Sequence, residues 1–174
     1  MPLAALLHEW HDFYLLVGTA GATLVALLFV AVSLGTGFLT EKRAAATRAF
    51  YSPVVVHFTV VFFISAACIA PVRNFTILAA TIAIAALVGI GVSGFTIVQL
   101  LRNRWTQYVR DHLAYGALPA VCYAALLAAA AMIYTQSKYA PDDLACALIL
   151  LLIVNIRNAW DLMLSMVRRH SADN

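Results

Sequence analysis

Charged residues are scarce in this chain. Asp, Glu, Lys and Arg together make up 11% of its 174 residues, whereas soluble domains carry roughly a quarter. So few charges do not cover a water-exposed surface, while a content of 64% hydrophobic residues suits a protein embedded in lipid. The composition therefore argues against a soluble domain and favours an integral membrane protein.

Cysteine and recognisable catalytic motifs are also lacking. The three cysteines, Cys68, Cys122 and Cys146, lie in or at the edges of hydrophobic segments without metal or redox spacing, so we expect inert apolar side chains. No nucleophile, base and oxyanion group converge in the sequence. The basic and aromatic segment 102–110 is typical of a membrane interface. We therefore expect a non-enzymatic protein with the lipid bilayer as its surroundings, no cofactor and no nucleic-acid partner.

Long hydrophobic segments define the expected fold. Five of them approach the roughly 20 residues that a helix needs to cross a bilayer. Pro119 lies inside the fourth and predicts a kink, because proline cannot donate a backbone hydrogen bond. We expect a single all-α, polytopic transmembrane domain over 1–174, a bundle of five helices. The predicted spans are 13–38, 53–72, 75–101, 113–135 and 145–167.

The basic residues predict the orientation of this bundle. Eight of the 11 Lys and Arg residues fall in the first loop, the third loop or the tail, which five spans would place on one side of the membrane. Basic residues prefer the cytoplasmic side, so the sequence predicts an external N-terminus and a cytoplasmic C-terminus. The eight are Lys42, Arg43, Arg48, Arg102, Arg104, Arg110, Arg168 and Arg169.

Small residues indicate where the helices touch. Between helices in lipid, close approach of the backbones replaces the hydrophobic effect as the source of affinity, so glycine marks contacts. The first and third spans are rich in small side chains, and we expect these two spans to be central. The predicted helix-packing residues are Gly18, Gly21, Gly89, Gly91 and Gly94.

Polar residues inside the fifth span predict a functional site, because ionisable groups at membrane depth are costly and rare. At about 100° per residue, four polar residues share one stripe of this helix, opposite an apolar stripe suited to lipid. The polar stripe contains Arg157, Asn158, Asp161 and Ser165, and the apolar stripe contains Ile149, Ile153, Ile156, Trp160 and Met163.

Other polar groups are expected at the same depth. Asn155 extends the polar surface, and His57 in the second span lies in the same half of the membrane. We expect Arg157 and Asp161 to pair along one helix, with His57 as the outside partner of Asp161. Two interpretations stay open: a buried polar clasp that fixes helix register, or the lining of a path for an ion or substrate.

A second polar group lies before the first span. One helical turn would bring His8, His11 and Asp12 close enough to offer two imidazoles and a carboxylate to a metal ion. The alternative is an amphipathic helix at the membrane surface, with Trp10 and Phe13 seated among the lipid headgroups.

Segments 13–20 (FYLLVGTA) and 156–161 (IRNAWD) resemble those of small, poorly characterised multi-span bacterial membrane proteins, some labelled as modulators of a membrane-bound AAA protease. The resemblance implies a location in a bacterial inner membrane. Together with the polar stripe, these features favour a homo-oligomeric ion channel or small transport protein that acts on a small ion. The alternative is a regulatory or accessory subunit that binds another membrane protein, for example a membrane protease.

Overall fold

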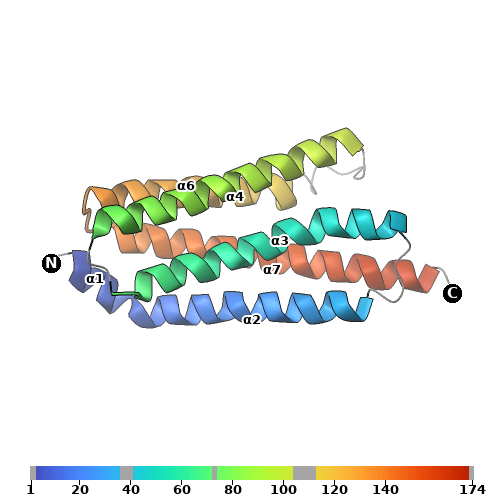
Figure 1. The fold of residues 1–174 in the computed structure, drawn as a ribbon, viewed down its shortest axis with the longest axis horizontal. Coiled ribbons are helices and arrows are strands. Elements are labelled where there is room, and N and C mark those ends of the chain that lie inside the picture. Colours follow the sequence, from blue (N-terminus) through green and yellow to red (C-terminus); the bar gives the residue numbers. More distant parts are fainter. Residues whose placement is uncertain (1–2, 36–40, 72–73, 104–112, 173–174) are drawn as a thin grey trace.

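The chain folds into long helices that run alongside one another (Figure 1). The computed structural model describes residues 3–35, 41–71, 74–103 and 113–172. This described part contains no strand, so the expected all-helical class is confirmed. The elements are α1 (Leu3–Glu9), α2 (His11–Gly35), α3 (Glu41–Ile69), α4 (Phe75–Asn103), the π-helical turn η2 (Leu113–Ala117), α6 (Leu118–Tyr134) and α7 (Ala140–Ala172).

Each predicted span overlaps one of these helices, and the fourth overlaps η2 and α6 together. The second predicted span, 53–72, differs from the other four, because α3 begins with a polar, charged segment and becomes apolar only over Pro53–Ile69. This apolar part is shorter than a typical span, so a multi-pass membrane protein is supported and the second span stays a prediction. Within the described part of the chain, four helices are long and apolar enough to cross a membrane: His11–Ala31, Phe75–Gln99, Tyr115–Tyr134 and Ala140–Leu164.

Four of the helices form a closed ring. Extensive contacts join α3 to α4, α4 to α6, α6 to α7 and α7 back to α3, while α2 packs on the outside of this ring against α3 and α7. The predicted central position of the first and third spans is therefore wrong, because α3 and α7 each have three helical neighbours. Helix α1 and the C-terminal end of α7 lie at opposite ends of the bundle (Figure 1).

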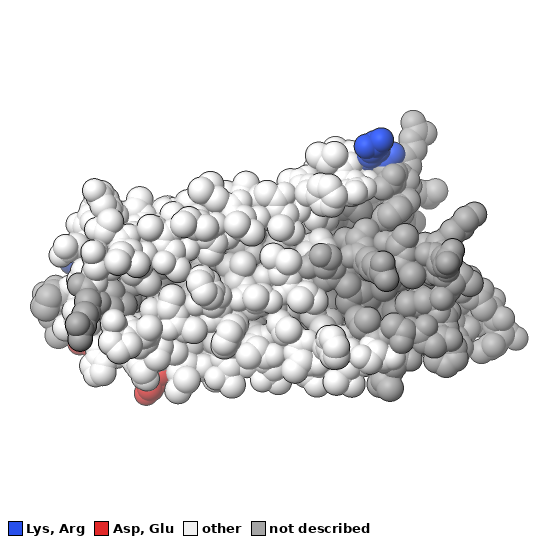
Figure 2. Space-filling view, viewed as in Figure 1, with Lys and Arg blue, Asp and Glu red and all other residues white. Residues whose placement is uncertain are grey.

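The surface and the interior are both apolar, as expected for a protein surrounded by lipid. Large side chains such as Leu16 and Phe29 are exposed by 70% and 76%, whereas a soluble monomer rarely exposes extended apolar surface. In the view of Figure 2, charged residues appear only towards the two ends, and the described surface between them carries none. The middle of the bundle is thus the part suited to the hydrocarbon region.

Pro119 shapes the start of the fourth predicted span. It lies in the first turn of α6, immediately after the π-helical turn η2. Proline has no backbone N–H to donate, and a π-helical turn, with its wider hydrogen-bond spacing, tolerates that missing donor. Such turns often occur at functional sites. Gly116 within η2 permits close packing on α4, because an added Cβ would overlap the side chain of Ile97. Pro119 therefore lies at a π-to-α transition, in the first turn of a helix, and the predicted kink stays a prediction.

Candidate functional site

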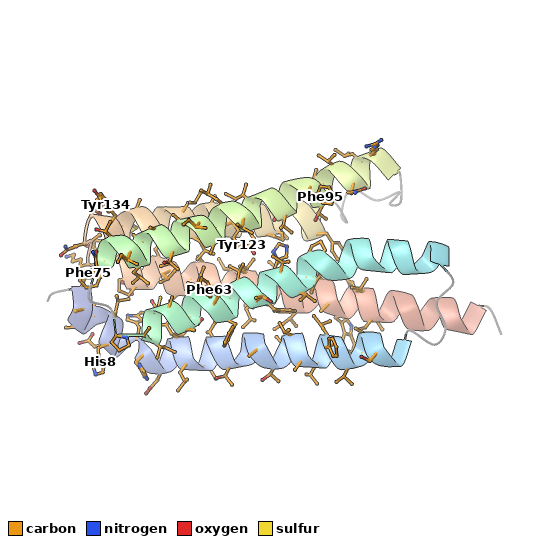
Figure 3. All side chains as sticks on the ribbon, in the orientation of Figure 1. His8, Phe63, Phe75, Phe95, Tyr123 and Tyr134 are labelled. Atoms are coloured by element: carbon orange, nitrogen blue, oxygen red, sulfur yellow. The ribbon has the colours of Figure 1, made fainter. Side chains whose placement is uncertain are left out.

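His57 is the most deeply buried ionisable side chain of the predicted polar cluster. It lies on α3 with 1% exposure, and its Nδ1 is 2.7 Å from the hydroxyl oxygen of Tyr123 on α6. The expected partnership of His57 with Asp161 is wrong: Nδ1 pairs with Tyr123, and Nε2 has no hydrogen-bond partner. The bond crosses the interior of the ring from α3 to α6, and Figure 3 shows Tyr123 near the middle of the bundle.

Gly89 creates the space for this hydrogen bond. An added Cβ at Gly89 on α4 would overlap the ring of Tyr123, whose side chain is fully buried. Gly89 therefore has the predicted packing role: the absence of a side chain on α4 leaves room for an aromatic ring from α6. Three consecutive members of the helical ring, α3, α4 and α6, thus combine to position one polar pair.

Asn155 and Asn158 also point into the bundle, with 0% and 1% exposure. The Asn155 amide nitrogen donates to the carbonyl oxygen of Leu151 at 2.8 Å, one turn earlier on the same helix. The backbone carbonyl of Asn158 accepts a hydrogen bond of 3.1 Å from the hydroxyl of Tyr115. Because Tyr115 belongs to η2, the π-helical turn ties the start of the α6 segment to α7.

Arg157 and Asp161 form the expected ion pair along α7, with a nitrogen–oxygen distance of 3.6 Å. Their side chains are 45% and 42% exposed, so a single chain does not cover this part of the stripe. The inward face of α7 follows Leu151, Asn155 and Asn158, and a residue next to Asn158 is rotated away by about 100°. The polar stripe therefore divides into two inward amides and an outward ion pair.

The opposite stripe behaves as expected. Ile149, Ile153, Ile156 and Trp160 are all exposed, and Met163 is half-buried. These apolar side chains would face lipid. The side chain of Ser165, the last member of the predicted polar stripe, lies outside the described residues.

The predicted packing glycines fall into two groups. Gly18 and Gly21 on α2 face α3, where an added Cβ would lie 2.9 Å from the Ser65 Cβ and 3.1 Å from the Phe58 carbonyl oxygen, respectively. Around Gly91 and Gly94 on α4, nothing lies within 4 Å of an added Cβ. These two glycines therefore do not mediate packing within the chain, because they lie on the outward side of α4.

The predicted metal ligands do not converge. His8 and Asp12 are exposed and His11 is half-buried, and the helix is interrupted at Trp10, between α1 and α2. The two imidazole rings are 6.2 Å apart between centroids. Among the residues that the structure describes, no three His, Cys, Asp or Glu side chains form a group able to hold a metal ion. His8, His11 and Asp12 therefore do not form the predicted metal site.

Sequence reasoning missed the partner of His57. A signal for it was present, since the hydroxyl of a tyrosine within an apolar span needs a hydrogen-bond partner once the helix is buried. It also did not single out Ser93, which is buried with an unpartnered hydroxyl. Comparison of the chain with protein-family models, with curated proteins and with solved structures gives no match.

Proposed function

We propose that the protein is a five-span membrane protein that assembles into a homo-oligomeric ion channel or small transport protein. The observation that carries this proposal is the position of the Arg157–Asp161 ion pair, which is exposed on the outside of α7 within a candidate membrane span. A bacterial inner membrane, with the N-terminus outside and the C-terminus in the cytoplasm, follows from the sequence resemblance and from the distribution of basic residues.

The depth of the pair supports assembly. Arg157 and Asp161 precede Leu164, the end of the candidate span, by seven and three residues, or roughly 10 Å and 5 Å along a helix. Facing lipid there, an arginine must bend towards the headgroups at a cost in free energy. A second copy of the chain removes this cost if it covers the pair. The surface is self-complementary, because each copy presents one positive and one negative group.

A channel or transport role follows from the same geometry. When several copies place α7 around a symmetry axis, their Arg157 and Asp161 side chains converge there and line a polar passage through the cytoplasmic half of the membrane. The exposed apolar stripe of α7 and the outer faces of the other helices remain available to lipid. Small ions are the substrate class that such alternating charges accommodate.

The experiment compares ion flux into liposomes for the parent protein and for Arg157→Gln/Asp161→Asn. We expect the double variant to assemble normally and to lose or alter flux, because the charges act on the permeant ion. The matched control is Ile153→Leu, a volume-conserving change on the exposed stripe of the same helix, which should leave flux unchanged. Normal assembly with unchanged flux in the double variant would rule out this role for the pair.

The single variant Asp161→Asn separates transport from a structural clasp. If the pair serves only to stabilise the fold, Asp161→Asn lowers the folded yield by leaving Arg157 uncompensated, and the double variant recovers part of that yield. Such a recovery, with flux intact, contradicts the transport proposal. Mass measurement in nanodiscs that finds only monomer over a wide concentration range contradicts the assembly on which the proposal depends.

A second candidate function is an accessory subunit that binds another membrane protein. Gly91 and Gly94 favour it, because both lie on α4 with open space beside them, and small residues let a foreign helix approach closely. Co-purification of one defined membrane protein that is lost in Gly91→Leu/Gly94→Leu would support this function. Retention of the partner by that variant would exclude these glycines as the docking surface.

A further inference from the structure

Three buried polar atoms within the helical ring lack a hydrogen-bond partner. They are His57 Nε2 on α3, Ser93 Oγ on α4 and Asn155 Oδ1 on α7, and each of these residues is at most 1% exposed. Tyr123 on α6 completes the set through its bond to His57 Nδ1. Every helix of the ring thus contributes at least one buried polar side chain.

These side chains lie at similar heights along the bundle. Two contacts between α4 and α6 relate positions along the two helices: Gly89 packs against Tyr123, and Ile97 packs against Gly116. Ser93 is midway between Gly89 and Ile97 on α4. It therefore lies one helical turn, or about 6 Å along the bundle, from the height of Tyr123.

The contact between Tyr115 and Asn158 fixes the level of α7 in the same way. The Tyr115 hydroxyl donates to the Asn158 carbonyl, so these two residues lie at similar heights on neighbouring helices. Asn155 precedes Asn158 by almost one turn of α7, which brings it near the height of Pro119, about one turn after Tyr115. Ser93 on α4 also lies near the height of Pro119. Ser93 and Asn155 therefore come from opposite helices of the ring at one height, a turn away from the His57–Tyr123 bond.

Leaving these atoms unpaired is costly, and a bundle surrounded by lipid offers no bulk solvent to compensate. Asn155 already uses its amide nitrogen on Leu151, so its Oδ1 remains an acceptor. The Ser93 hydroxyl both donates and accepts, and His57 Nε2 donates or accepts according to its tautomer. A guest that donates to Asn155 Oδ1, and donates to or accepts from the other two groups, satisfies all three.

We propose that the ring interior of each protomer binds water at a site formed by His57, Ser93 and Asn155. No ionised Asp, Glu, Lys or Arg side chain is among the buried residues of the described chain, so nothing there would balance a charged guest. An uncharged molecule with about three hydrogen-bonding positions fits, and water has this capacity. The site lies inside one chain and does not depend on oligomer formation or on the Arg157–Asp161 pair.

The test measures magnetisation transfer from water to side chains by solid-state NMR of the full-length protein in liposomes. Labelled histidine reports on His57, with assignment by His57→Gln, and the labelled methyl group of Ile82, buried at 0% exposure, serves as the reference for a dry interior. We expect rapid build-up at His57 and slow build-up at Ile82. Build-up at His57 as slow as at Ile82 in the parent protein would overturn the proposal.

Substitutions locate the water within the ring. We expect Ser93→Ala and Asn155→Leu each to reduce the rapid component at His57, because each removes a hydrogen-bonding position. Ser65→Ala is the matched control: Ser65 is also buried with an unpartnered hydroxyl, but it faces Gly18 of α2, outside the ring, so its variant should leave the rapid component unchanged. Rapid transfer that survives both ring substitutions also overturns the site.

Discussion

The contact between Gly89 and Tyr123 makes a prediction that distinguishes three glycines on one helix. Gly89, Gly91 and Gly94 all belong to α4, and an alanine Cβ at Gly89 would overlap the Tyr123 ring, while at Gly91 or Gly94 it would meet nothing within 4 Å. The ring cannot move away freely, because its hydroxyl is bonded to His57. Gly89→Ala should therefore destabilise the fold, and the other two alanine variants should not.

Two opposing effects set the magnitude. Replacing a helical glycine by alanine favours the helix by up to about 1 kcal/mol, and this gain applies at all three positions. Overpacking a well-filled interior costs about 1–3 kcal/mol, and this cost applies only at Gly89. With the full helical gain subtracted, we expect Gly89→Ala to lower the free energy of unfolding by up to about 2 kcal/mol. Gly91→Ala and Gly94→Ala should leave it unchanged or raise it by up to about 1 kcal/mol.

Reversible unfolding in detergent micelles, followed by circular dichroism, measures these differences on one scale. The double variant Gly89→Ala/Tyr123→Leu tests the cause, because a smaller side chain on α6 removes the overlap and should reduce the additional cost of the alanine. Equal stability of Gly89→Ala and Gly91→Ala would refute the reasoning. So would an unchanged cost of Gly89→Ala in the Tyr123→Leu background.

Two further predictions concern the buried hydrogen bond and the topology. Tyr123→Phe should lower the free energy of unfolding by about 1–3 kcal/mol, because it leaves Nδ1 of the buried His57 without its partner. Tyr134→Phe, at a side chain exposed by 65%, should change it by less than about 0.5 kcal/mol. Equal effects of the two variants in the same unfolding assay would contradict the role of the bond. Reporter fusions should place Met1 outside and the segment after Arg168 in the cytoplasm, and two termini on one side would exclude five spans.

The helices and their approximate ends could be predicted from the sequence. The length of a hydrophobic segment and the charged or turn residues at its ends are local properties of the sequence. Each predicted span accordingly overlaps a helix of the structure. The contacts of Gly18, Gly21 and Gly89 with neighbouring helices also agree with the expectation from residue size, because no larger side chain permits the same backbone approach. The exposed stripe from Ile149 to Trp160 likewise follows from helical periodicity.

Only the tertiary structure decided which polar groups meet. In lipid, the outside of a bundle is as apolar as its interior, so hydrophobicity does not determine how each helix rotates about its axis. That rotation pairs His57 with Tyr123 rather than Asp161, turns Asn155 inward while Arg157 stays exposed, and leaves Gly91 and Gly94 without neighbours. The sequence by itself determined a bundle of apolar helices with polar groups inside their spans, and the packing between helices divided those groups into an interior site and an outer ion pair.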